Sequence, residues 1–162
     1  MSDWFVVNLA EAQAFRHADF GSGVIFEGAD GGFEQLGVNV RWLEPGQPAS
    51  MYHAEAAQEA YLVLHGEATL IVDDTERALR AWDFVHLPPG TAHVLVGAGE
   101  GPCAVLMVGA RLGEEQGLRF PVSMAAARYG ASVEAETTDR AEAYAGKPSG
   151  FEPRQPFWPP SE

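Results

Sequence analysis

The sequence has almost no cysteine and almost no lysine, and each scarcity excludes a class of chemistry. Cys103 is the only cysteine among 162 residues, so neither an intramolecular disulfide nor a cysteine-based zinc site can form. It opens an apolar run, which fits a small buried hydrophobe better than a nucleophile. The only lysine, Lys147, lies in a proline-rich stretch, so Schiff-base or pyridoxal chemistry has no core nucleophile.

Positive charge and long apolar runs are also scarce. The chain has 10 basic and 23 acidic residues, hence a net charge of −13. This is the wrong sign for binding nucleic acid or an anionic membrane. No segment approaches the roughly 20 apolar residues of a membrane span, and the N-terminus lacks the basic and apolar regions of a signal peptide. We therefore expect a soluble, cytoplasmic protein that binds neither nucleic acid nor a membrane.

Short apolar segments separated by turn residues fill the chain up to about Ala110. In Val38–Leu43, for example, apolar residues alternate with Asn39 and Arg41. Further strands are predicted over Tyr61–Leu64, Ala68–Val72, Phe84–Leu87, His93–Val96 and Ala104–Val108. Many short strands at this spacing predict an antiparallel sandwich or barrel.

The pattern changes after Arg111. Ser123 can cap a short helix over Met124–Tyr129, and Thr138 or Asp139 can cap another over Arg140–Ala145. Residues 147–162 are rich in proline and aromatic side chains. We expect this tail to be extended, without secondary structure of its own, and to pack on its own barrel or on a neighbouring subunit.

Two imidazoles and two carboxylates stand at positions that suit a metal site. His53 and Glu55 are two residues apart, so on a strand they share a face. Glu59 follows after a short offset, and His93 lies on another strand behind a proline-glycine turn. Oxygen and imidazole ligands suit Fe(II), Mn(II), Ni(II) or Zn(II), so we expect one divalent metal ion.

At these residues the sequence resembles the cupin superfamily, whose small β-barrel carries two motifs. Residues 46–66 resemble the first motif: Gly46, His53, Glu59 and Gly66 fit its frame, and Glu55 stands where the second histidine belongs. Residues 82–97 resemble the second motif. There Pro88, Gly90 and His93 match, whereas Trp82-Asp83 replaces Gly-Asp and Gly97 replaces an asparagine that is often present.

The resemblance implies an all-β fold, an antiparallel jelly-roll barrel over residues 1–112. Short helices over 113–146 would pack on the barrel, the Pro/aromatic tail would cover 147–162, and the whole would be one domain. The resemblance also implies a homodimer that handles a small molecule. It does not choose a reaction, because one fold hosts many functions.

The replacement at Glu55 leaves three interpretations of the metal site. Glu55 is a fourth ligand; or it turns outward and His53, Glu59 and His93 hold the metal alone; or the barrel holds no metal. Tyr61, His86 and Arg41 are further pocket candidates. His86 could face the cavity as an acid–base group, although a structural histidine is the simpler interpretation.

These observations predict a metal-dependent enzyme of the dioxygenase, isomerase or lyase type that acts on a small organic molecule. The alternative is a cupin that binds a small molecule without catalysis. Glu55 and Gly97 favour the alternative, since both depart from the usual family site.

Overall fold

The computed structural model describes residues 4–27, 32–113 and 117–154. The described elements, in chain order, are η1 (Leu9–Glu11), β1 (Ala14–His17), β2 (Gly21–Ile25), β3 (Leu36–Leu43), β4 (Glu59–His65), β5 (Glu67–Val72), β6 (Thr75–Arg80), β7 (Phe84–Leu87), β8 (His93–Ala98), β9 (Cys103–Ala110), α1 (Met124–Ala127), α2 (Arg140–Ala143) and β10 (Glu152–Arg154). The predicted β fold is confirmed. Among the described residues no helix is long and apolar enough to cross a membrane.

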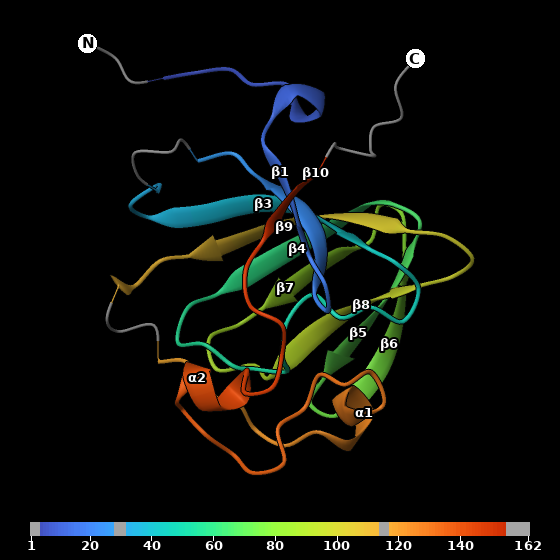
Figure 1. The fold of residues 1–162 in the computed structure, drawn as a ribbon, viewed down its shortest axis with the longest axis vertical. Coiled ribbons are helices and arrows are strands. Elements are labelled where there is room, and N and C mark those ends of the chain that lie inside the picture. The colour runs from blue at the N-terminus through green and yellow to red at the C-terminus, as the bar shows by residue number, and fades with distance from the viewer. Residues whose placement is uncertain (1–3, 28–31, 114–116, 155–162) are drawn as a thin grey trace.

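The strands form two antiparallel sheets that face each other (Figure 1). The larger sheet has seven strands in the order β10-β1-β2-β3-β9-β4-β7, and the smaller has three in the order β6-β5-β8. Residues 48–53 run beside β8 as an irregular further strand, through bridges at Pro48–Val96 and His53–His93. This is the jelly-roll arrangement of a cupin barrel.

The main core lies between the two sheets because alternate residues of each strand point inward. On β4 the inward residues Tyr61 and Val63 are buried, while Leu62 between them is half-buried. Val105 of β9 and Leu95 of β8 complete this layer. The same alternation places Glu59, two residues before Tyr61, at the inner face where β4 begins.

The β5–β6 hairpin owes its geometry to two aspartates. Asp73 and Asp74 have φ of 48° and 59°, the left-handed pair of a type I′ turn, which aspartate tolerates better than most residues. Asp74 also binds the C-terminal segment: its Oδ1 accepts hydrogen bonds from the Ser123 hydroxyl at 2.5 Å and the Ala125 amide at 2.9 Å. The turn therefore connects the barrel to the start of α1.

The short helices lie at the end of the molecule opposite η1 (Figure 1). Ser123 caps α1 by accepting a hydrogen bond from the Ala126 amide, and Asp139 caps α2 through the Ala141 amide. Ala125 and Ala126 pack against Ile71 and Val94, so α1 covers part of the smaller sheet.

The expectation that residues 147–162 lack secondary structure is wrong for part of the tail. Glu152–Arg154 forms β10, which pairs with β1, and residues 155–162 lie outside the described part. Phe151 packs edge-on against Phe15 at 4.8 Å between ring centroids. His17 holds the preceding turn, since its Nε2 lies 3.0 Å from the carbonyl oxygen of Pro148. An edge strand accommodates Pro153 because one side of it needs no hydrogen bonds.

Candidate metal centre

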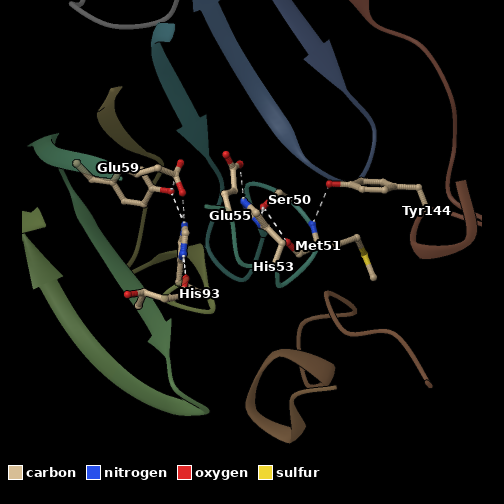
Figure 2. Close-up of polar contacts among 9 residues, drawn as sticks. Ser50, Met51, His53, Glu55, Glu59, His93 and Tyr144 are labelled. Carbon is tan, nitrogen blue, oxygen red and sulfur yellow. Dashed lines mark hydrogen bonds and ion pairs between the residues drawn. The ribbon is translucent and has the colours of Figure 1, made fainter. Parts of the chain in front are cut away.

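Three strands deliver the candidate ligands to one end of the barrel. His93 is the first residue of β8, Glu59 is the first residue of β4, and His53 lies on the segment beside β8. His53 and His93 are direct cross-strand partners with ring centroids 4.9 Å apart. Figure 2 shows the carboxylate of Glu59 turned toward the His93 ring and that of Glu55 toward the His53 ring.

Both imidazole rings are oriented in the same way by the backbone. Nδ1 of His53 lies 2.8 Å from the carbonyl oxygen of Met51, and Nδ1 of His93 lies 2.9 Å from that of Thr91. A carbonyl can only accept a hydrogen bond, so each Nδ1 carries a proton, and in the neutral ring Nε2 keeps the lone pair. Metal-binding histidines are commonly held in this tautomer by such a contact.

The Nε2 atom of His93 lies among oxygen atoms that suit a shared proton or a cation. It is 3.0 Å from Oε2 of Glu59 and 2.8 Å from the hydroxyl oxygen of Tyr61. The Tyr61 hydroxyl also lies 3.1 Å from Oε1 of Glu59, to which it donates its proton. Nε2 of His93 therefore needs either a proton of its own or a metal ion next to the Glu59 carboxylate.

His53, Glu59 and His93 fit that requirement as a group. One ligand atom from each lies within 4.8 Å of the others, a spacing that a single ion can bridge. Two imidazoles and one carboxylate form a ligand set suited to divalent Fe, Mn, Ni or Zn. His93 is buried and the other two are half-buried, so the group is sheltered but accessible from one side.

Glu55 lies at the edge of this group rather than within it. Its Oε1 is 3.4 Å from Nε2 of His53, and it does not belong to the three-residue cluster found among the described residues. Its side chain is 19% exposed, against 12% for His53. Glu55 is therefore the more solvent-accessible partner of a ligand candidate.

Burial and neighbouring carboxylates shift two pKa values at the site. Burial strongly opposes ionisation of Tyr61, and the adjacent Glu59 adds to it, so the pKa of Tyr61 lies well above its usual range. For His53, burial lowers the pKa, but the hydrogen bonds to Glu55 and to the Met51 carbonyl outweigh it and raise the pKa overall. The carboxylates that raise the pKa of His53 stabilise positive charge beside its Nε2, and a proton and a metal ion compete for that atom.

Two of the remaining pocket candidates lie inside the barrel and one lies outside. Tyr61 and Arg41 are on the inner faces of β4 and β3. His86 does not reach the interior: Val85 and Leu87 point inward on β7, so His86 is exposed on the opposite face. The acid–base interpretation of His86 has no support in this position.

One contact of the site region has no local sequence signature. The Met51 amide donates a hydrogen bond to the Tyr144 hydroxyl at 3.2 Å, across 93 positions of the chain. This hydrogen bond joins the residue that directly follows α2 to the segment that carries His53 (Figure 2). Only the fold brings these residues together.

The comparisons with known proteins agree on the family. Residues 40–109 match the family described as "Cupin domain". A sugar phosphate isomerase of the cupin superfamily from Silicibacter pomeroyi superposes with a TM-score of 0.58 at 27% identity, over 65% of this chain and 75% of that one. No curated protein matches.

Two other solved structures share the fold. The polyketide cyclase RemF from Streptomyces resistomycificus gives a TM-score of 0.57 at 15% identity, over 70% of this chain and 89% of that one. A cupin protein from Bacteroides fragilis gives 0.55 at 18% identity, over 72% and 92%. The match over residues 40–109 contains His53, Glu59 and His93, and it identifies this part of the chain as a cupin domain.

Proposed function

We propose that the protein binds one divalent metal ion through His53, Glu59 and His93 and acts as a metal-dependent isomerase on a small oxygenated molecule. The observation that carries the proposal is the shared orientation of the two imidazoles. Each Nδ1–H donates to a backbone carbonyl, so both Nε2 lone pairs are free for a cation next to the Glu59 carboxylate.

A metal bound there would act as a Lewis acid on a carbonyl or hydroxyl oxygen of the substrate. The chain's own groups would then complete the chemistry. Tyr61 donates its hydroxyl proton to Glu59 and keeps that carboxylate oriented. We assign the role of base to Glu55, the more solvent-accessible carboxylate beside His53: it would take up a proton from a carbon of the substrate and return it to the neighbouring carbon.

The similarity to the Silicibacter pomeroyi protein supports isomerisation over the other cupin reactions, because that structure is described as a sugar phosphate isomerase at 27% identity. Isomerisation also needs no external oxidant, unlike the dioxygenase reaction. A non-catalytic binding protein is the alternative, and the replacement of a histidine by Glu55 is the observation that favours it.

The test is elemental analysis of protein purified without a metal-affinity tag, alongside His93→Ala. We expect about one equivalent of a transition metal in the wild type and none in the variant. His86→Ala is the matched control, because it removes an exposed histidine from the outer face of the barrel. Retention of metal by His93→Ala would contradict the ligand assignment.

The reaction is tested separately with the metal-loaded protein. Aldose and ketose phosphates are incubated with it in D₂O, and exchange of the carbon-bound proton is followed by proton NMR. Isomerisation by proton transfer predicts exchange in the wild type that is lost in Glu55→Gln. Metal-loaded protein without exchange on any substrate would favour the binding alternative.

We also propose that the protein is a homodimer formed through the outer face of the larger sheet. Leu62, Leu106 and Val108 point outward there, are half-buried, and carry no charge in a chain of net charge −13. An uncharged patch is where two such chains can approach each other. Light scattering should show a dimer in the wild type and a monomer for Leu106→Glu.

A further inference from the structure

Arg41 is a cation held inside the barrel by the backbone. Alternation along β3 turns it to the inner face, between the outward residues Val40 and Trp42. Its Nη2 donates hydrogen bonds to the carbonyl oxygens of Phe20 and, at 3.0 Å, Ala49. These two contacts hold the guanidinium in place through neutral carbonyl oxygens, so they do not neutralise its positive charge.

The positive charge of Arg41 has no negative partner in the described part of the chain. None of the ion pairs found there involves Arg41. Its Nε is buried without a hydrogen-bond partner, and so is Oδ1 of Asn39, two residues earlier on the same face. Burial lowers the pKa of Arg41 to about 10, which still leaves it charged at neutral pH.

The guanidinium lies over the Phe15 ring, 5.4 Å from its centroid, which stabilises the cation only in part. A sheltered charge without a carboxylate partner is still costly, so its retention needs a reason. The chain has 23 carboxylates for 10 basic residues, yet none of the described ones is placed against this guanidinium. The arrangement is that of a cation whose counter-ion comes from outside the chain. Of the guanidinium nitrogens, Nε is buried without an acceptor, and both of the described hydrogen bonds use Nη2, which leaves Nη1 for an outside acceptor.

Arg41 lies on the same inner face of the larger sheet as Tyr61 and Glu59. It is opposite Val105 on β9, which is opposite Val63 on β4, and Tyr61 is the next inward residue toward Glu59. Two strand spacings and two residues separate the Cα atoms of Arg41 and Tyr61 by roughly 12 Å, and both side chains point inward. The charge of Arg41 acts on the Tyr61 hydroxyl, which contacts His93.

We propose that Arg41 binds an anionic oxygen group, a carboxylate or a phosphate, of the small molecule that the His53–Glu59–His93 centre handles. One end of that molecule would offer a hydroxyl or carbonyl oxygen to the metal, and the other would supply the counter-ion of Arg41. The link between the two ends rests on the proposed function. The anion site itself depends on Arg41 alone.

The test measures anion binding without metal. Chelator-treated protein is titrated with inorganic phosphate and with acetate, at constant ionic strength kept by chloride, and the melting temperature is followed by calorimetry. We expect a saturable rise with at least one of these anions. Arg41→Met should weaken the apparent affinity at least about tenfold, the loss expected for a charge-assisted hydrogen bond. Arg77→Met, which removes an exposed arginine of β6, should leave it unchanged.

Arg41→Met also loses the contacts to Phe20 and Ala49 and can unfold for that reason. Asn39→Asp keeps these contacts and adds a carboxylate two residues from Arg41 on the same face. It should raise the melting temperature without added anion and remove the response to phosphate and acetate. No saturable response in the wild type, or an unchanged response in Asn39→Asp, would overturn the proposal.

His93→Ala separates this inference from the proposed function. An anion response that persists in His93→Ala, while metal is lost, supports Arg41 as an independent anion site. A response that is lost with His93 means that the anion binds at the metal centre, which overturns the role of Arg41 and leaves the metal proposal intact. The wild-type protein could also take up no metal and still show an anion response that depends on Arg41. In that case the anion site stands and the proposed function is refuted.

Discussion

Trp82 occupies a backbone conformation that suits glycine, and replacing it should stabilise the protein. Its φ is 75°, in the left-handed region, and its side chain is 72% exposed. A side chain there costs about 1–2 kcal/mol, and glycine removes this cost but loses about 0.5–1 kcal/mol through its freer unfolded state. The exposed indole adds little burial. We therefore expect Trp82→Gly to raise the free energy of unfolding by about 0.5–1 kcal/mol.

A gain of this size corresponds to a rise in melting temperature of about 1–4 °C for a domain of this length. Calorimetry at a fixed scan rate measures it, provided that unfolding is reversible. Trp82→Ala is the control, because it removes the same indole and keeps the left-handed backbone. The amide of Trp82 donates to the carbonyl of Val63 at 2.7 Å, a backbone contact that neither substitution removes. If the glycine variant melts at or below the alanine variant, backbone strain at Trp82 is not the cause.

Three further predictions concern carboxylates and the thiol. Glu59→Gln should weaken metal binding at least about tenfold more than Glu55→Gln in calorimetric titrations, because Glu59 belongs to the ligand cluster and Glu55 does not. Hydrogen bonds, first that from Ser123, lower the pKa of Asp74, so its stabilising effect is present above about pH 4 and lost as the pH falls. The melting-temperature difference between wild type and Asp74→Asn should accordingly shrink between pH 6 and pH 3. Burial raises the pKa of Cys103 to about 11, so a maleimide should label this thiol only after denaturation.

The strands predicted from the sequence are those with an apolar inner face. Tyr61–Leu64 lies within β4, which begins two residues earlier and so includes Glu59 as its first residue. The strands without that signal were missed. β6 is almost wholly exposed and has a single β-branched residue, and β2 begins Gly-Ser-Gly, which disfavours a strand. Only pairing with a neighbour makes these segments strands.

The candidate site was predictable to a similar degree. His53 and His93 could be paired because the family frame places them together, and the structure makes them cross-strand neighbours. The contact of the Tyr61 hydroxyl with His93 spans 32 positions and was not predictable from either residue. The carbonyl oxygens that hold Arg41 could not be predicted at all, because every residue carries one and the sequence gives no sign of which will face inward.

The departures from the cupin motifs have different physical causes and should not be counted as one signal. Gly97 replaces an asparagine because a turn passes close to it: an added Cβ would lie 2.2 Å from the carbonyl oxygen of Glu44. That is a packing constraint on β8, four residues from His93, and it says nothing about metal. Trp82 stands where the motif has glycine, and it keeps the left-handed backbone conformation that favours glycine. Neither residue touches the candidate ligands.

Glu55 is thus the one departure that bears on the chemistry. It exchanges a neutral imidazole for a carboxylate beside His53, so the four residues would carry two negative charges when both glutamates are ionised. Such a set balances a dication, whereas without one it leaves like charges near two imidazole lone pairs. Without a metal, the carboxylate of Glu55 is left to pair with a proton on His53, whose Nε2 lies 3.4 Å away. The metal analysis of wild-type protein and His93→Ala therefore decides what the replacement at Glu55 does: bound metal makes it part of an altered metal centre, and its absence makes it the partner of a protonated histidine.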